Sequence, residues 1–307
     1  MAQMASQRPA RSSRSGGDTP QPPLAAAASH ESVVPPVTVT SMVAGPIMYV
    51  VVGAGGTGAR VIPPLTQMMR QGDHLAIIDH DIVEDRNLHR QHFTQRDIGM
   101  PKAMVLAGRY RKEGVGMTAF QVQLEVGNVR SCCDSVSAAF PRANAVITIG
   151  CVDGSAGRRA IAAFQHLVGR AYSHVAWIDV GNETRSGQVL LEANHWPCAV
   201  VSVSGARHAT APLSIPGMSI GMPQLLRPVD GEEDEASCRD RIDIQTVQVN
   251  HMAAAMVLNM VGQLTLQIPF TAAGAFFSTT NTMQPIRLVQ YAPPEILPET
   301  TYAIVEG

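Results

Sequence analysis

The sequence is poor in aromatic residues and has almost no net charge. Of its 307 residues, 5% are aromatic, and the formal net charge is −2 at pH 7. Surfaces that bind nucleic acid need positive charge for the phosphates and, for single strands, aromatic rings for the bases. The composition therefore disfavours a nucleic-acid partner, and binding through a local patch is the weaker alternative.

The sequence also lacks paired cysteines. Its five cysteines are scattered, and none forms a C-x-x-C pair. A four-cysteine zinc site needs such pairs, so we expect no structural zinc. The pattern is typical of a reduced cytoplasmic protein with buried thiols. The residues are Cys132, Cys133, Cys151, Cys198 and Cys238.

The chain has no long uninterrupted apolar run. Residues 1–44 are rich in Pro, Ser, Ala and Gly and contain no apolar core of a secretory signal, so we expect a disordered N-terminal tail. The most apolar later stretch is Met252–Phe277, which polar residues and a proline interrupt. A membrane span needs about 20 cleaner residues. We predict a buried helix followed by a strand, and no membrane contact.

Short apolar runs rich in β-branched residues alternate with segments of helical periodicity. This alternation predicts an α/β fold, Rossmann-like, whose mostly parallel sheet is flanked by helices. After Gly187 successive strands predict antiparallel pairing in the C-terminal part. The expected strands are 47–52, 74–79, 117–124, 144–150 and 174–180, and the expected helices are 57–70, 101–114, 155–168 and 243–261.

These elements predict one domain from residue 45 to residue 307. Its nucleotide-binding part covers about 45–188, and its C-terminal part covers about 189–307. The C-terminal part contains a Pro/Gly/Met-rich stretch, Ala209–Pro228, which we expect to be a long loop, and then the acidic run Asp230–Glu235. Loops of this length are usually functional or disordered.

A glycine loop follows the first apolar run. Gly53, Gly55 and Gly58 satisfy G-x-G-x-x-G between a strand and a helix, where a backbone can approach a pyrophosphate. Asp79 ends the second strand, 79 − 58 = 21 residues beyond the last glycine. An acid at this spacing accepts hydrogen bonds from a ribose hydroxyl. The pattern predicts nucleotide binding but does not separate NAD from ATP.

The segment DHDIVEDRNLHRQ, which begins at Asp79, separates these two nucleotides. Its Arg90 offers a planar fork that suits phosphate oxygens, and Lys102 follows near a helix start. Hydride transfer gains nothing from two cations directed at phosphates, whereas cleavage of a phosphoanhydride does. The segment therefore favours ATP chemistry over a nicotinamide-dependent oxidoreductase.

These combined motifs resemble a known family. G-x-G-G-x-G, then D-x-D-x-V-E-x-x-N-L-x-R-Q, then G-x-P-K is the pattern of the ThiF/MoeB-type adenylating enzymes, relatives of the ubiquitin-activating enzymes. The resemblance covers about Ile47–Gln188. The stretch ASCRDR and the overall length are most similar to the ThiF proteins of the PRTRC cassette.

The resemblance implies roles for individual residues. It implies ATP with Mg²⁺ as cofactors, Asp153 as the acid beside the metal, and Arg90 and Lys102 as catalytic residues on the phosphates. Two departures from the family pattern are Arg86 in place of serine and Gly154 in place of asparagine. The implied nucleotide-binding residues are Gly53, Gly55, Gly56, Gly58, Asp79, Asn87, Arg90, Lys102 and Arg158.

The resemblance also implies a reaction and partners. Such enzymes usually act as homodimers and activate the C-terminal carboxylate of a small ubiquitin-like protein as an acyl-adenylate. Cys238 follows the acidic run, where relatives that form a thioester place their cysteine, so it is either catalytic or a loop cysteine without a role. Two alternatives remain open: an ATP-dependent dehydratase that modifies tRNA, and a nucleotide-binding scaffold without activity.

Overall fold

One large sheet passes through the protein, and the strand β2, Ile47–Val52, is the central strand of its parallel part. The computed structural model describes residues 38–88, 91–183, 185–201, 207–215, 223–227, 247–266, 268, 272–278, 284–290 and 302–305. All of these residues belong to the compact unit Pro35–Gly307.

The sheet has a parallel and an antiparallel part. Among the described residues it runs in the order β11-β10-β9-β7-β6-β5-β2-β3-β4, and β1 and β8 both pair with β7. The strands β4, β3, β2, β5 and β6 are parallel to one another. The pairing of β6 with β7 and all the pairings beyond it are antiparallel. The other strands are β1 Thr38–Ser41, β3 His74–Ile78, β4 Gly116–Phe120, β5 Ala145–Gly150, β6 His174–Asn182, β7 Ser186–Val201, β8 Arg207–Ile215, β9 Ala272–Ser278, β10 Gln284–Gln290 and β11 Tyr302–Val305.

The parallel part has the strand order of a dinucleotide-binding fold. β2 lies between β3 and β5, so the chain moves outward to β3 and β4 and then returns to the other side of β2. In folds of this kind ligands bind at the reversal of strand order, beyond the carboxyl ends of the strands, which here are the ends of β2 and β5. The predicted fold class, an α/β protein of the Rossmann type with antiparallel strands in its C-terminal part, is confirmed.

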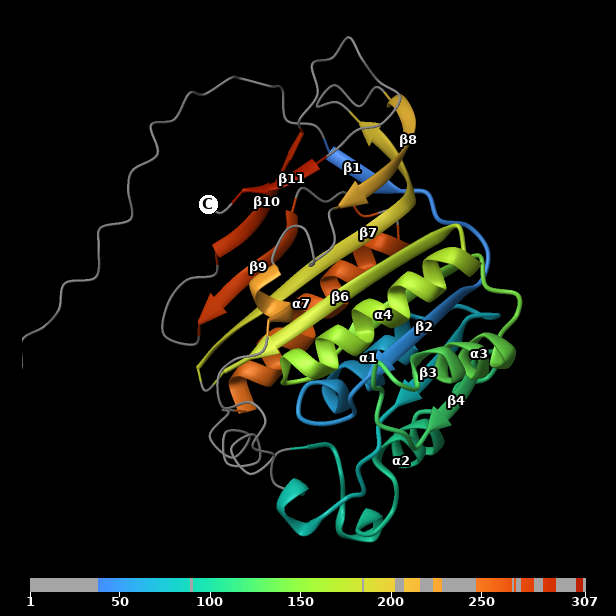
Figure 1. The fold of residues 1–307 in the computed structure, drawn as a ribbon, viewed down its shortest axis with the longest axis vertical. Helices are drawn as coiled ribbons and strands as arrows, with labels where there is room; N and C mark the ends of the chain where they lie inside the picture. The colour runs from blue at the N-terminus through green and yellow to red at the C-terminus, as the bar shows by residue number, and fades with distance from the viewer. Residues whose placement is uncertain are drawn as a thin grey trace, which may run out of the picture. The chain divides into compact units, whose positions relative to one another are not determined.

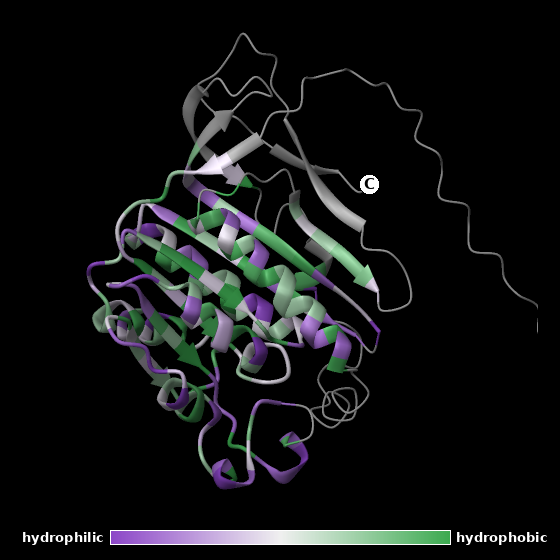
Figure 2. Ribbon diagram, turned by 180° about the vertical axis from the view of Figure 1, so that it is seen from behind, coloured by the Kyte–Doolittle hydropathy of each residue, from purple (hydrophilic) through white to green (hydrophobic). Residues whose placement is uncertain are grey.

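Helices cover both faces of the sheet (Figure 1). α3 Val129–Ala139 and α4 Ser155–Ala171 pack on one face, and α1 Gly58–Met68, α2 Lys102–Arg109 and α7 Val247–Thr265 pack on the other. Each face of the sheet has its own hydrophobic core, and β2 contributes to both. Tyr49 and Val51 face α1 and α7, while Met48 and Val50 face α3 and α4. Figure 2 shows this helical face of the sheet from behind, coloured by hydropathy. The buried apolar residues of α7 belong to the same core cluster as Tyr49 and Val51 of β2.

The structure differs from the sequence-based expectation at three places. The tail expected through residue 44 includes β1, whose β-branched Thr38–Ser41 pair with Cys198–Val201 of β7. The loop expected at Ala209–Pro228 contains most of β8, which pairs with β7. α3 was not expected, because its apolar stripe is narrow and two cysteines form part of it.

Two further expectations differ from the structure in the extent of an element. The two strands expected after Gly187 are one strand, β7, of 16 residues. The helix expected at 101–114 ends earlier, at Arg109. None of the helices in the described part of the chain combines the length and hydropathy that a membrane-spanning helix needs.

Removal of the Phe164 ring tests the α4 core. Phe164 is fully buried between α4 and the sheet, so Phe164→Ala leaves a cavity and should lower the free energy of unfolding by about 3–5 kcal/mol. Urea denaturation measures the loss. The matched control is Phe120→Ala, because Phe120 on the edge strand β4 is only partly buried and should cost clearly less. Equal losses in the two variants would contradict this packing.

Candidate functional site

The glycine loop lies at the reversal of strand order. Gly53 directly follows β2, has a φ of 95°, and donates its N–H to the carbonyl oxygen of Ile78 at 2.9 Å. A Cβ on Gly53 would collide with the carbonyl oxygen of Cys151, and one on Gly58 would collide with the carbonyl oxygen of Gly53. A Cβ on Gly55 would meet no atom within 4 Å. The loop is therefore packed tightly on the protein side and accessible at Gly55.

Asp79 connects this loop to the end of β3. One carboxylate oxygen accepts a hydrogen bond from the N–H of Ala54 at 2.5 Å, and the other accepts one from the N–H of Asp81 at 2.7 Å. Burial raises the pKa of Asp79, although these hydrogen bonds and the charge of Lys102 oppose the rise. Each carboxylate oxygen has a second lone pair. The geometry is compatible with a ribose hydroxyl at Asp79, and that role stays a prediction.

Lys102 is brought to the same edge of the sheet. It is the first residue of α2, its side chain is 6% exposed, and its Nζ lies 2.7 Å from Oδ2 of Asp81. Burial alone would raise the pKa of Asp81, but the hydrogen bond and charge of Lys102 outweigh burial and lower it. Asp79, His80 and Asp81 lie close enough to hold a cation. Lys102 already supplies positive charge there, so a metal ion is not needed at this position.

Asn87 shapes the segment between β3 and α2. It ends the short 3-10 helix η1, Asp85–Asn87, and its Oδ1 accepts a hydrogen bond from the N–H of Glu84 at 2.8 Å. Its side chain is buried. Arg90 and Cys238, which the sequence analysis singled out, lie outside the described residues.

Asp153 and Arg158 stand on opposite sides of the first turn of α4. Asp153 is exposed just before the helix, two residues after the cysteine whose carbonyl abuts Gly53. Arg158 instead points inward: its Nε donates to Oδ2 of Asp179 at 2.9 Å, and Asp179 is fully buried. Burial raises the pKa of Asp179, and the guanidinium of Arg158 opposes that rise. Arg158 therefore neutralises a buried acid, and its predicted contact with nucleotide is untested.

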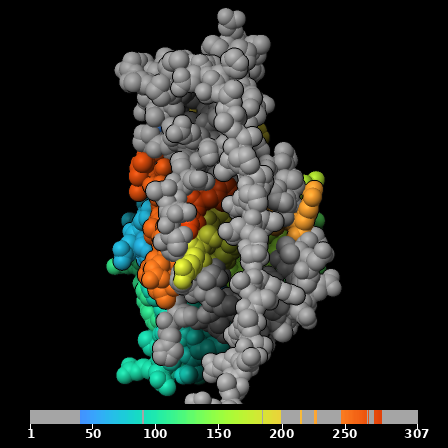
Figure 3. Space-filling model, turned by 90° about the vertical axis from the view of Figure 1, so that its left-hand side faces the viewer, coloured from blue at the N-terminus to red at the C-terminus, as the bar shows by residue number. Residues whose placement is uncertain are grey.

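Three polar residues that the sequence analysis missed hold the glycine loop from the other side. Oγ1 of Thr57 donates to Oδ1 of Asn250 at 2.9 Å, and Nδ2 of Asn182 donates to Oγ1 of Thr57 at 2.6 Å. Asn182 ends β6, and Asn250 lies in the first turn of α7. Figure 3 shows orange atoms of α7 beside yellow-green atoms from the β6–β7 region. The signal in the sequence was an asparagine near the start of a mostly apolar helix.

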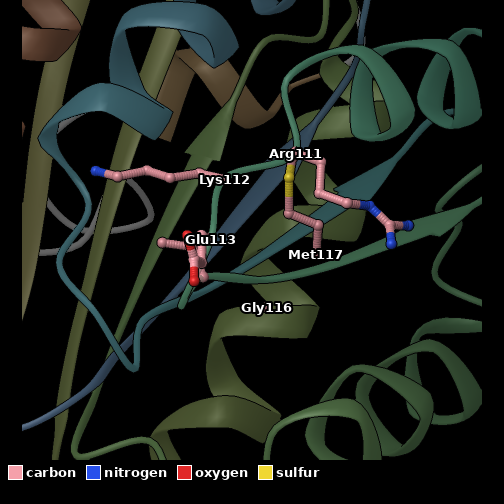
Figure 4. A pocket seen from close by; sticks show the side chains of 6 residues that line it. Arg111, Lys112, Glu113, Gly116 and Met117 are labelled. Atoms are coloured by element: carbon pink, nitrogen blue, oxygen red, sulfur yellow. The ribbon is translucent and has the colours of Figure 1, made fainter.

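A cavity of ≈ 490 Å³ lies elsewhere, where the chain enters β4 (Figure 4). Gly116, in its lining, begins β4, whereas the glycine loop follows the end of β2, so the two features lie at opposite edges of the parallel strands. Nζ of Lys112 in this lining donates to the carbonyl oxygens of Gln67 and Met69 near the end of α1. Lys112 thus stabilises a helix end, and we assign the cavity no part in the candidate site.

The comparisons with known proteins identify the family. The family model of the ThiF family matches residues 47–294, which is most of the chain. The protein therefore belongs to the ThiF family. No curated protein matches the chain.

Solved structures share the fold. E. coli MccB with succinimide is 15% identical, with a TM-score of 0.50 over 78% of this chain and 63% of MccB. E. coli MccB with MccA-N7isoASN is 16% identical, with a TM-score of 0.50 over 78% of this chain and 64% of MccB. The E. coli tRNA N6-threonylcarbamoyladenosine dehydratase TcdA is 23% identical over 43% of this chain and 50% of TcdA, with a TM-score of 0.35. This chain thus spans less than two thirds of the length of MccB, and at these identities the likeness concerns the fold.

Arg158→Met tests the buried ion pair. The change leaves the Asp179 carboxylate buried without its cation, so we expect the free energy of unfolding to fall by about 3–5 kcal/mol. The double variant with Asp179→Asn should recover part of this loss, because a neutral amide needs no counter-charge. Urea denaturation of the two variants measures both effects. A double variant no more stable than Arg158→Met alone would contradict the pairing.

Proposed function

We propose that this protein is an ATP-dependent adenylyltransferase that activates the C-terminal carboxylate of a small ubiquitin-like protein. One observation carries the proposal: a ThiF-family glycine loop stands at the reversal of strand order, with the buried ammonium of Lys102 beside it. A loop of this kind suits a pyrophosphate, and a buried cation beside it suits a triphosphate. NAD would need only the loop and the acid Asp79.

The partner is the finer part of the proposal. The ubiquitin-like substrate comes from the resemblance of the motifs to the ThiF/MoeB-type enzymes. The E. coli MccB structure that contains MccA-N7isoASN supports a search for a small peptide or protein as the second substrate. We further propose that residues 45–307 act as one domain, that the protein works as a homodimer, and that it resides in the cytoplasm.

Each residue of the site has its own role in the proposed reaction. The glycine loop holds the phosphates through its N–H groups, and Asp79 accepts a hydrogen bond from the ribose. The incoming carboxylate is ionised at pH 7, so the attack on the α-phosphate requires no general base. Charge accumulates on the departing pyrophosphate, and Lys102 and Arg90 stabilise it. Lys102 is held by Asp81 at 2.7 Å, which positions its ammonium before the nucleotide arrives.

Asp153 fits the proposed Mg²⁺. Its carboxylate is exposed at the end of β5, beside the loop, and Mg²⁺ binds through one or two carboxylates together with phosphate oxygens. A bound Mg²⁺ supplies charge stabilisation to phosphoryl oxygens. Asp153 would hold the ion in this chain.

Lys102→Ala tests the proposal. Loss of one preorganised charge at the phosphates should lower the rate of ATP–pyrophosphate exchange by about 100-fold or more in the presence of the protein partner. The partner is found first by mass spectrometry, as a small protein that gains an AMP adduct when incubated with the purified enzyme and ATP. Thermal melting without ligand shows whether the variant is folded.

The matched control is Lys112→Ala, a lysine at the opposite edge of the parallel strands. It should leave the exchange rate within about twofold, the spread expected for a residue remote from the chemistry. If Lys102→Ala exchanged as fast as the wild type, the assignment of Lys102 would be wrong. Exchange that depended on added tRNA instead of a protein would favour the dehydratase alternative.

Cys238→Ala tests whether a thioester follows the adenylate. If Cys238 is the acceptor, attack by its thiolate on the acyl-adenylate releases AMP and joins the partner's carbonyl carbon to sulfur. The wild type should then form a conjugate that dithiothreitol cleaves, and Cys238→Ala should form none while ATP–pyrophosphate exchange persists. Cys198→Ala is the control, since Cys198 is buried and burial raises the pKa of its thiol to about 12. A conjugate that survives in Cys238→Ala would exclude this cysteine.

A further inference from the structure

Arg60 is a buried arginine that the proposed reaction has not yet used. It lies in the first turn of α1 and is 6% exposed. Its Nη1 donates to the carbonyl oxygen of Gly56 at 2.5 Å, so the guanidinium folds back onto the glycine loop. Its Nε is buried and has no hydrogen-bond partner within the described part of the chain.

No carboxylate of the described residues forms an ion pair with Arg60. The other buried cations near the site are paired: Lys102 with Asp81 at 2.7 Å and Arg158 with Asp179 at 2.9 Å. A buried charge without a counter-charge is expensive, and an arginine does not escape the cost by losing its proton. Burial lowers the pKa of Arg60, in line with that cost. Burial of this uncompensated charge therefore destabilises the fold, and a bound anion would remove the destabilisation.

Two histidines lie near Arg60. His92, after η1, and His251, in the first turn of α7, have ring centroids 6.5 Å apart. Burial lowers the pKa of both rings, and the charge of Arg60 lowers each of them further. Arg109, whose Nη1 donates to the carbonyl oxygen of His92, contributes to the shift at His92. The two rings are therefore close enough to Arg60 to respond to its charge, and as neutral imidazoles they do not supply a counter-charge.

The guanidinium of Arg60 lies near the start of α1, and a helix start favours the binding of an anion. The helix has 11 residues, and the glycine loop precedes it with Gly55 accessible. The N–H groups and the dipole at such a helix start attract phosphate, and a guanidinium donates two parallel hydrogen bonds to phosphate oxygens. Both features lie on the same loop, since Arg60 already contacts Gly56.

We propose that Arg60 binds a phosphate of the nucleotide at the glycine loop, with His92 and His251 completing the wall of that subsite. The inference rests on the proposed function, because it assumes that the loop binds ATP. Within the described part of the chain, Arg60 breaks no ion pair when it forms this contact. It gains a counter-charge that the described residues do not supply.

Binding of ATP and of adenosine separates this role from a structural one. We expect Arg60→Gln to weaken ATP binding by about 10- to 100-fold in isothermal titration, the value of one charge-assisted hydrogen bond to phosphate. Adenosine affinity should stay within about twofold, because adenosine has no phosphate for a guanidinium to contact. Arg60→Lys keeps the charge but loses the planar fork, so it should lie between Arg60→Gln and the wild type.

The control is Arg130→Gln, an exposed arginine of α3 on the other face of the sheet, which should bind ATP as the wild type does. Without ligand, Arg60→Gln should melt at or above the wild-type temperature, because it removes an uncompensated buried charge. A large drop in its melting temperature, or equal losses for ATP and adenosine, would overturn the inference. Unchanged ATP binding in Arg60→Gln would overturn it too while leaving the proposed function intact. A folded wild type that binds neither ATP nor adenosine would overturn both.

Discussion

The contact between Asp79 and the glycine loop is the constraint on which the candidate site depends. One carboxylate joins the amide of Ala54, after β2, to the amide of Asp81, after β3. The same bond network continues through Asp81 to the ammonium of Lys102 at the start of α2. The glycine loop, Asp79 and Lys102 are thus held in one chain of hydrogen bonds, and their relative positions follow from the ends of two neighbouring parallel strands.

A second set of bonds holds the loop from the opposite side. Thr57, Asn182 and Asn250 connect the start of α1 with the end of β6 and the first turn of α7. α7, which carries Asn250, begins at Val247, nine residues after Cys238 in the sequence. Arg60 and His251 meet in the same region. The carboxyl edge of the sheet is therefore polar and tightly connected, in contrast with the two apolar cores beneath the helices.

The sequence permitted the parallel half of the fold to be predicted because its signals are local. Continuous apolar runs mark β2, β3 and β5, and the glycine spacing marks the loop between β2 and α1. β1 and β8 were missed because their short strands gain their stability from pairing with β7, which lies far along the chain from β1. The structure brings Lys102 to the carboxyl edge beside Asp79, as the motif suggests. The burial of Arg158 against Asp179 and of Arg60 without an acid could not be read from spacing, because both depend on which side of a helix faces the sheet.

β1 has a consequence for the order in which the protein assembles. Its residue Ser41 accepts a hydrogen bond from Nε1 of Trp196, which is 155 positions later, and donates one to the carbonyl oxygen of Leu264, which is 223 positions later. Because synthesis proceeds from the amino end, β1 leaves the ribosome long before Trp196 and Leu264 have been made. The first strand of the fold is therefore among the last to dock. Until then the edge of the nascent sheet that it will cover stays open to other chains.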